Sequence, residues 1–201
     1  MCRTHREEGG ENIMSRVAAV TNRHLAARPF LEQIERVCRL HPAAVILREK
    51  DLAERDYTLL AGQVLEVCRA YQVSCVYHTY PEAALRAGVK AIHLPLPLLR
   101  AYREQGLLES FVHVGTSVHS AAEAGEALRL GATCLTAGHI YSTDCKKGLP
   151  PRGLSYLKEI CSLSSAPVWA IGGIHTGQGQ VEEVLSCGAA GACVMSEMMR
   201  I

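Results

Sequence analysis

Short apolar runs alternate with segments of helical spacing along nearly the whole chain. Eight runs are apolar throughout and have the length of strands buried on both faces; they cover residues 16–21, 43–48, 73–78, 91–94, 111–117, 133–138, 167–172 and 191–196. Seven segments between them repeat apolar residues three and four positions apart, as amphipathic helices do; they cover residues 29–40, 57–71, 81–88, 97–105, 120–131, 153–163 and 179–188. The pattern therefore predicts strands and helices in strict alternation.

Continuously apolar strands that are joined through helices are typical of a parallel sheet covered on both faces. Eight such strands favour a closed (β/α)8 TIM barrel, with a doubly wound open sheet as the alternative. The chain of 201 residues is short for this barrel and ends soon after the eighth run, so we expect the eighth outer helix to be short or absent. We expect one compact TIM-barrel domain over residues 15–201, preceded by a flexible polar leader over residues 1–14.

Composition and charge narrow the classes of function. Hydrophobic residues make up 48% of the chain and charged residues 20%, which is an ordinary globular balance. The formal net charge of +1 lacks the basic excess of a general nucleic-acid or membrane-surface binder, and no long apolar run predicts a transmembrane helix. Nine cysteines without any Cys-x-x-Cys pair indicate free thiols in a reducing compartment, so we expect a cytoplasmic protein.

Two segments near the C-terminus are candidates for binding phosphate. Ligand sites in TIM barrels lie at the carboxyl ends of the strands, and phosphate is commonly held by the loops after strands seven and eight. Gly172 and Gly173 follow the seventh predicted strand, and Met195 and Ser196 end the eighth. Backbone amides there are predicted to hold a phosphate group. The alternative is a tight turn that needs glycine for its backbone conformation.

Cationic and hydroxyl side chains follow the second and sixth predicted strands. Arg48 and Lys50 alternate with apolar and acidic neighbours at the end of strand two, so both can point into the barrel mouth. The longest internal loop, over residues 139–153, contains Thr143 and Lys146. These four side chains are candidates for binding a carboxylate or phosphate. The alternatives are a solvated basic loop and a surface ladder of charges.

Four of the nine histidines fall near predicted strand ends; they are His78, His93, His119 and His139. They come from four different strands, and no acidic residue accompanies them in ligand spacing, so we predict no metal site. His119 precedes the Ser-x-x-Glu spacing of a capping box, which fixes the start of the next helix and leaves the histidine at the barrel mouth. It is a candidate acid/base, and the alternative is an ordinary turn residue.

Three longer motifs resemble the thiamine phosphate synthase superfamily. They are "GTSVHSAAEA", "AGHIYSTDCKKGLPPRG" and "PVWAIGGI", and the resemblance runs from about Ser15 to the C-terminus. The "SVHS" and "GHIYSTDCKKG" stretches look most like the thiazole tautomerase (TenI-type) branch. The synthase pattern has Asn-Asp after strand three and a further Asp after strand four, which serve Mg²⁺. This chain has His78 and Thr79 at the first place and Leu98 at the second.

The resemblance implies an isomerase that needs no cofactor and acts on a small thiazole phosphate. Its substrate would be a carboxythiazole phosphate tautomer with an exocyclic double bond, and its product the aromatic 2-(2-carboxy-4-methylthiazol-5-yl)ethyl phosphate. His119 matches the acid/base histidine of the tautomerase branch. The implied substrate-binding residues are Arg48, Lys50, Ser117, Thr143, Lys146, Gly172, Gly173, Met195 and Ser196. The family also implies a homodimer.

Two alternatives remain from the sequence. One is thiamine phosphate synthase, a Mg²⁺-dependent transferase that would use Arg48 and Lys50. The other is a non-catalytic regulator that binds thiamine phosphates in the same pocket. The missing carboxylates count against the transferase, because a diphosphate leaving group needs its charge neutralised.

Overall fold

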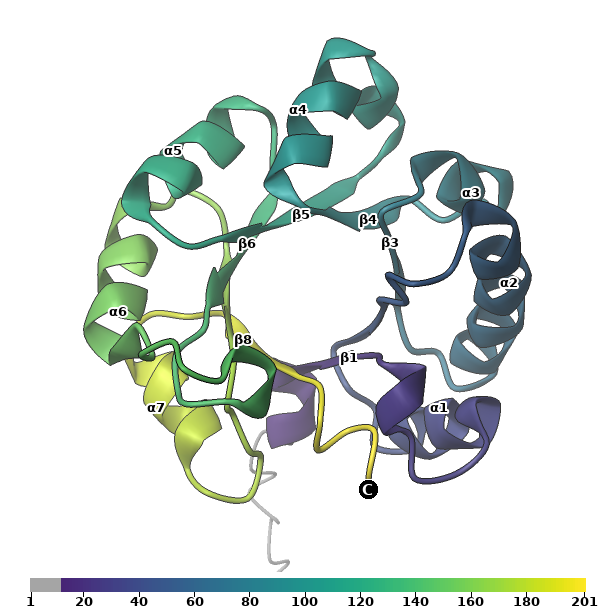
Figure 1. The fold of residues 1–201 in the computed structure, drawn as a ribbon, viewed down its shortest axis with the longest axis horizontal. Helices are drawn as coiled ribbons and strands as arrows, with labels where there is room; N and C mark the ends of the chain where they lie inside the picture. The colour runs from purple at the N-terminus through teal and green to yellow at the C-terminus, as the bar shows by residue number, and fades with distance from the viewer. Residues whose placement is uncertain (1–11) are drawn as a thin grey trace, which may run out of the picture.

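A computed structural model describes residues 12–201 of the chain. Eight parallel strands close into a barrel in sequence order, and β1 pairs with both β2 and β8 (Figure 1). The strands are β1 (Val17–Val20), β2 (Ala44–Leu47), β3 (Cys75–His78), β4 (Ala91–Leu94), β5 (His113–Val118), β6 (Cys134–Gly138), β7 (Val168–Ile171) and β8 (Gly191–Val194). The prediction of a (β/α)8 barrel is confirmed, and the open sheet is wrong.

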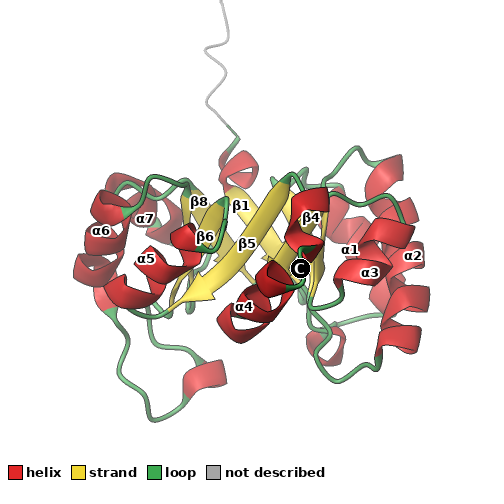
Figure 2. Cartoon of the chain, turned by 90° about the horizontal axis from the view of Figure 1, so that it is seen from above, coloured by secondary structure: helices red, strands yellow, loops and turns green. Residues whose placement is uncertain are grey.

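Within residues 12–201, seven α-helices form the outer ring, and in Figure 2 they flank the strands on both sides. They are α1 (Phe30–Cys38), α2 (Glu54–Ala70), α3 (Pro81–Arg86), α4 (Leu96–Glu104), α5 (Ala121–Arg129), α6 (Gly153–Leu163) and α7 (Gln180–Ser186). Short 3₁₀ segments are η1 (Ile13–Arg16), η2 (Arg23–Leu25), η3 (Leu107–Ser110) and η4 (Asp144–Lys146). Within residues 12–201 no regular helix follows β8, where residues 196–200 form a turn instead.

The strands separate two apolar layers because successive side chains point to opposite faces. The layer inside the barrel contains Ala18, Val20, Ile46 and Cys193, while the neighbouring positions along each strand pack outward against the helices. Gly191 illustrates how tightly the interior is filled. A Cβ atom there would lie 2.4 Å from the Trp169 ring. The interior below the mouth is therefore a packed core and not a pore.

The segment before the barrel is described only in part. Residues 1–11 of the predicted leader lie outside the described residues, whereas Ile13 and Met14 belong to η1, which the Asn12 side chain caps. None of the helices described is long and apolar enough to cross a membrane. The eight cysteines in the described part are free thiols, and four of them are buried: Cys38, Cys68, Cys75 and Cys193.

Candidate active site

One cavity of about 990 Å³ opens where the strands end at their carboxyl termini. The loop between β6 and α6, which carries η4, lies beside β8 at this mouth (green in Figure 1). All ten residues predicted to form the site line this cavity: Arg48, Lys50, Ser117, His119, Thr143, Lys146, Gly172, Gly173, Met195 and Ser196. The structure therefore brings the predicted residues together, and their individual roles stay predictions.

Three cations meet at the mouth of the cavity. Burial lowers the pKa of Arg48, which is half-buried. Burial also lowers the pKa of Lys50, and the positive charges of Arg48 and Lys146 lower it further. Within residues 12–201 none of these three side chains forms an ion pair with a carboxylate. Unpaired cations that repel one another gain stability when an anion binds between them, so this cluster is suited to a carboxylate or phosphate.

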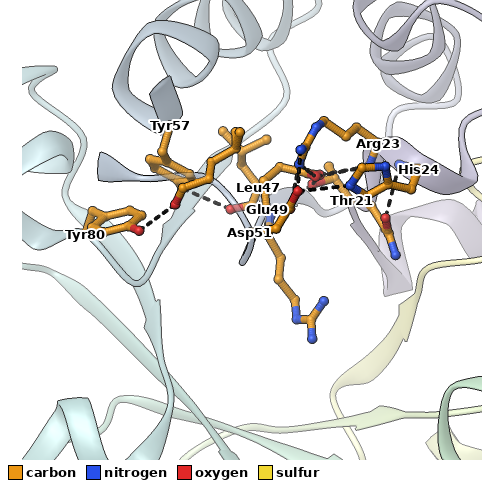
Figure 3. A network of polar contacts seen from close by, with 11 residues as sticks. Thr21, Arg23, His24, Leu47, Glu49, Asp51, Tyr57 and Tyr80 are labelled. Carbon is orange, nitrogen blue, oxygen red and sulfur yellow. Dashed lines mark hydrogen bonds and ion pairs between the residues drawn. The ribbon is translucent and has the colours of Figure 1, made fainter. Parts of the chain in front are cut away.

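The segment that carries Arg48 and Lys50 is held in place by hydrogen bonds to the buried carboxylate of Glu49. Glu49 is only 3% exposed. It accepts hydrogen bonds from the Thr21 hydroxyl at 2.7 Å, and from the backbone N–H and the guanidinium of Arg23 at 3.1 Å each (Figure 3). Thr21 in turn accepts the backbone N–H of Arg48 at 2.9 Å. This network joins the ends of β1 and β2 and sets the position from which the two cations reach the cavity.

An outer ion pair extends the same network. Arg23 also donates to Asp51 at 2.6 Å, and His24 Nε2 lies 3.0 Å from the Asp51 carboxylate (Figure 3). The hydrogen bonds from Arg23 hold the pKa of Asp51 below its usual range. Arg23 is thereby shared between two carboxylates, one buried and one exposed, and it is not among the residues that line the cavity.

His119 lies at the end of β5 and is held by the first turn of α5. Its backbone N–H donates to the Glu123 carboxylate at 2.7 Å, and its Nδ1 lies 3.3 Å from the same oxygen. Ser120 caps the helix by accepting the backbone N–H of Glu123 at 3.2 Å. One half of the predicted capping box is present, since Ser120 caps the helix, but the Glu123 carboxylate accepts the N–H of His119 and not that of Ser120. Both His119 and Glu123 line the cavity.

Two buried histidines form one wall of the cavity. The rings of His78 and His93 stack with centroids 5.5 Å apart, and His93 Nε2 lies 3.0 Å from the Ser117 hydroxyl. Burial lowers the pKa of His78 to about 2 and that of His93 to about 4, and the nearby cations Arg48 and Lys50 add to both shifts. At neutral pH both imidazoles are therefore uncharged hydrogen-bonding groups.

The loops after β7 and β8 have the features of a phosphate cradle. Gly172 and Gly173 both have positive φ, at 105° and 68°. Within the described chain no protein acceptor is recorded for the backbone N–H groups of Gly173, Ile174 and Ser196. Free amides at two adjacent loops are suited to bind phosphate oxygens.

The two glycines are also required by packing, as the alternative interpretation proposed. A Cβ atom on Gly172 would lie 2.4 Å from the Cβ of His139, and one on Gly173 would lie 2.3 Å from the Ser142 carbonyl oxygen. The loop after β6 therefore crosses directly over these positions. Phosphate binding and close packing would both require glycine at these two positions, because glycine lacks a Cβ atom.

Sequence reasoning missed the acidic residues that hold the site together. Glu49, Glu123 and Glu197 each tie a ligand-facing segment to a neighbouring element. Glu123 was recognisable as part of a capping box. Glu49 and Glu197 had no such signal, because their partners lie on other loops that only the closed barrel brings near.

The residues at the metal positions of the synthase pattern do not fit Mg²⁺. That ion prefers carboxylate oxygens, whereas His78 is an imidazole beside Arg48 and Lys50, and Leu98 is aliphatic. The described residues contain no group of three His, Cys, Asp or Glu side chains that could hold a metal ion.

Comparisons with known proteins identify relatives of the chain. Residues 17–198 match the family model described as thiamine monophosphate synthase. The chain is 31% identical over 186 residues to thiamine-phosphate synthase 2 of Streptococcus pneumoniae, which covers 92% of this chain and 88% of that protein. It is 33% identical over 190 residues to thiamine-phosphate synthase of Enterococcus faecalis, with 92% and 86% covered.

A solved structure shares the same fold. Thiamine phosphate pyrophosphorylase from Pyrococcus furiosus matches with a TM-score of 0.78 and 26% identity over 94% of this chain and 89% of that chain. The two bacterial relatives carry synthase names and the solved structure carries a pyrophosphorylase name, and none of these names distinguishes a tautomerase branch. The chain belongs to the thiamine monophosphate synthase family.

Proposed function

We propose that the chain is a thiazole tautomerase of thiamine biosynthesis. It would convert the carboxythiazole phosphate tautomer with an exocyclic double bond into aromatic 2-(2-carboxy-4-methylthiazol-5-yl)ethyl phosphate. One observation carries the proposal. The cavity holds a histidine–glutamate pair, while the positions of the synthase's metal carboxylates carry His78, Thr79 and Leu98.

His119 is the proposed acid/base. It removes the proton from the ring carbon that bears the carboxylate, and the electrons of that C–H bond move into the conjugated ring. The π electrons of the exocyclic double bond then form a new C–H bond with the proton that His119 returns. One imidazole serves both steps, because its ring nitrogen can accept the proton from the first carbon and then donate it to the second. Aromatisation of the ring supplies the driving force.

The cation cluster has a specific task in this reaction. Loss of a proton beside a carboxylate leaves negative charge that spreads onto the carboxylate oxygens. Arg48, Lys50 and Lys146 line the cavity without carboxylate partners in residues 12–201, so they are suited to stabilise that charge. The proposed phosphate cradle at Gly172, Gly173, Met195 and Ser196 would hold the other end of the substrate.

A second candidate function is thiamine phosphate synthase. The curated relatives bear that name, and the cavity retains Arg48 and Lys50, which are suited to a diphosphate. The observation against it is the misfit between Mg²⁺ and the residues at the expected ligand positions.

A paired assay separates the two functions. The purified protein is incubated with the non-aromatic tautomer, and formation of the aromatic thiazole is followed by ultraviolet absorbance, with and without EDTA. A parallel reaction contains the pyrimidine diphosphate, the thiazole phosphate and Mg²⁺, and thiamine phosphate is measured. We expect EDTA-resistant turnover in the first reaction and no product in the second.

The opposite results have definite meanings. Thiamine phosphate formed only with Mg²⁺, without conversion of the tautomer, would establish the synthase. Tight binding of thiamine phosphates with no turnover in either reaction would support a regulator, which was the second alternative from the sequence.

A further inference from the structure

We propose that Glu123 is a positioning residue for His119, an inference that rests on the proposed proton transfer. Its carboxylate would orient the imidazole ring, fix its tautomer and compensate the charge of the imidazolium formed during turnover. The capping box alone gives Glu123 only a structural role.

The contacts of one carboxylate oxygen support this role. Oε2 of Glu123 accepts the backbone N–H of His119 at 2.7 Å and lies 3.3 Å from Nδ1 of the ring. A neutral imidazole that donates from Nδ1 keeps its lone pair on Nε2. The pair therefore leaves Nε2 as the nitrogen that can take a proton from a ligand in the cavity.

The position of the histidine makes compensation necessary. His119 directly precedes Ser120, the N-cap of α5, and the N-terminal end of a nine-residue helix carries partial positive charge. The imidazolium formed during the proposed turnover would therefore lie beside this positive end of the helix. A carboxylate in the first turn of the same helix offsets that positive charge, and Glu123 is the acidic residue of that turn.

The cation near Glu123 binds a different carboxylate, so it does not compete with His119 for Glu123. Arg100 of α4 is the nearby cation, and it binds both carboxylate oxygens of Glu126, one turn further along α5. The Tyr156 hydroxyl of α6 donates to the Val118 carbonyl at 3.0 Å, and thereby holds the end of β5 without contacting the carboxylate. Among residues 12–201, His119 is consequently the side chain with which the Glu123 carboxylate makes a polar contact.

Two substitutions separate positioning from capping. Glu123→Gln keeps the cap, because glutamine also serves in a capping box, but it removes the charge. We expect kcat for the tautomer to fall on the order of 10-fold, with KM and the melting temperature nearly unchanged.

Ser120→Ala removes the side chain that caps α5 and keeps the Glu123 carboxylate. We expect it to lower the melting temperature and leave kcat unchanged. Glu126→Gln on the same helix is the matched control.

A spectroscopic measurement tests the orientation without substrate. Two-bond ¹H–¹⁵N correlation spectra of the labelled protein, at a pH where the imidazole is neutral, report which ring nitrogen of His119 carries the proton. We expect Nδ1–H in the wild-type protein and a mixture with Nε2–H in Glu123→Ala, while Ser120→Ala keeps the wild-type pattern.

The two measurements also distinguish the failure of this inference from the failure of the proposed function. If the wild-type protein does not convert the tautomer, the proposed function is wrong and the spectra still decide whether Glu123 orients His119. An unchanged His119 tautomer in Glu123→Ala, or wild-type kcat in Glu123→Gln, would overturn the positioning role.

Discussion

The carboxylate of Glu197, after β8, accepts a 3.0 Å hydrogen bond from the backbone N–H of Thr176, after β7. It also accepts the Thr176 hydroxyl and lies 3.3 Å from Nδ1 of His175. The two loops joined by this carboxylate supply the free amides of the proposed phosphate cradle. Glu197 therefore acts as a clamp between the two halves of that cradle.

Removal of the clamp should weaken binding of the phosphate end of the substrate. We expect Glu197→Ala to raise KM for the tautomer by about 10-fold, which corresponds to about 1.4 kcal/mol, while kcat changes less. Steady-state kinetics measures both constants. The control is Glu182→Ala, an exposed acidic residue of α7. An unchanged KM in Glu197→Ala would show that the loops keep their positions without the carboxylate.

Replacement of the proposed acid/base should separate chemistry from binding. We expect His119→Ala to abolish conversion of the tautomer, because the variant lacks the group proposed to carry the proton. The side chain lies at the mouth and is about 45% exposed, so its loss leaves the barrel core intact. Calorimetric titration with the aromatic product should therefore give an affinity close to that of the wild-type protein. Near wild-type turnover in this variant would make the assignment of His119 wrong.

The buried histidine pair should make stability depend on pH. The folded-state pKa of His93 is lowered from 6.5 to about 4, so the unfolded chain binds a proton in this range and the folded chain does not. The free energy of unfolding should therefore fall as pH decreases from about 6.5 towards 4, by about 1.4 kcal/mol per pH unit for each such histidine. The still lower pKa of His78, about 2, extends this loss to more acidic solutions.

Urea unfolding of a variant at several pH values tests this dependence. We expect His93→Gln, whose amide can still bond to Ser117, to have a shallower slope between about pH 6.5 and 5 than the wild-type protein. His113→Gln removes an exposed histidine from the start of β5 and should leave the slope unchanged. Equal slopes in all three proteins would mean that His93 titrates normally.

The fold could be predicted because each helix and strand is encoded by the pattern of apolar residues within its own segment. Most positions of each strand are apolar and each helix has its own apolar face, so every predicted element was found within a few residues of its expected bounds.

The site was predictable only in part. The rule that ligands bind at the carboxyl ends of the strands selected residues such as Arg48 and His119, because it depends on position along each strand. No role was predicted for Glu49 and Glu197, because their hydrogen-bond partners lie on other loops that come close only in the folded barrel. The neutral state of His78 and His93 also needed the structure, since it results from burial and from cations on another strand.

The buried carboxylate of Glu49 is expected to be important for both stability and anion binding. In Glu49→Gln, the amide keeps one acceptor oxygen but presents an N–H₂ group where Arg23 and Thr21 now donate. We expect the free energy of unfolding to fall by about 2 kcal/mol, because hydrogen bonds to a buried charge are lost and donors are left unpaired. Urea denaturation measures this loss.

The same substitution should weaken binding of the aromatic product. Thr21 holds the backbone of Arg48 and is itself held by Glu49, so loss of the carboxylate loosens the segment that presents Arg48 and Lys50. Glu54→Gln, which removes an exposed ion pair with Arg86, is the control and should change neither property appreciably. Lower stability with unchanged affinity would restrict Glu49 to a structural role, whereas a loss of both would link this buried network to the cations that face the ligand.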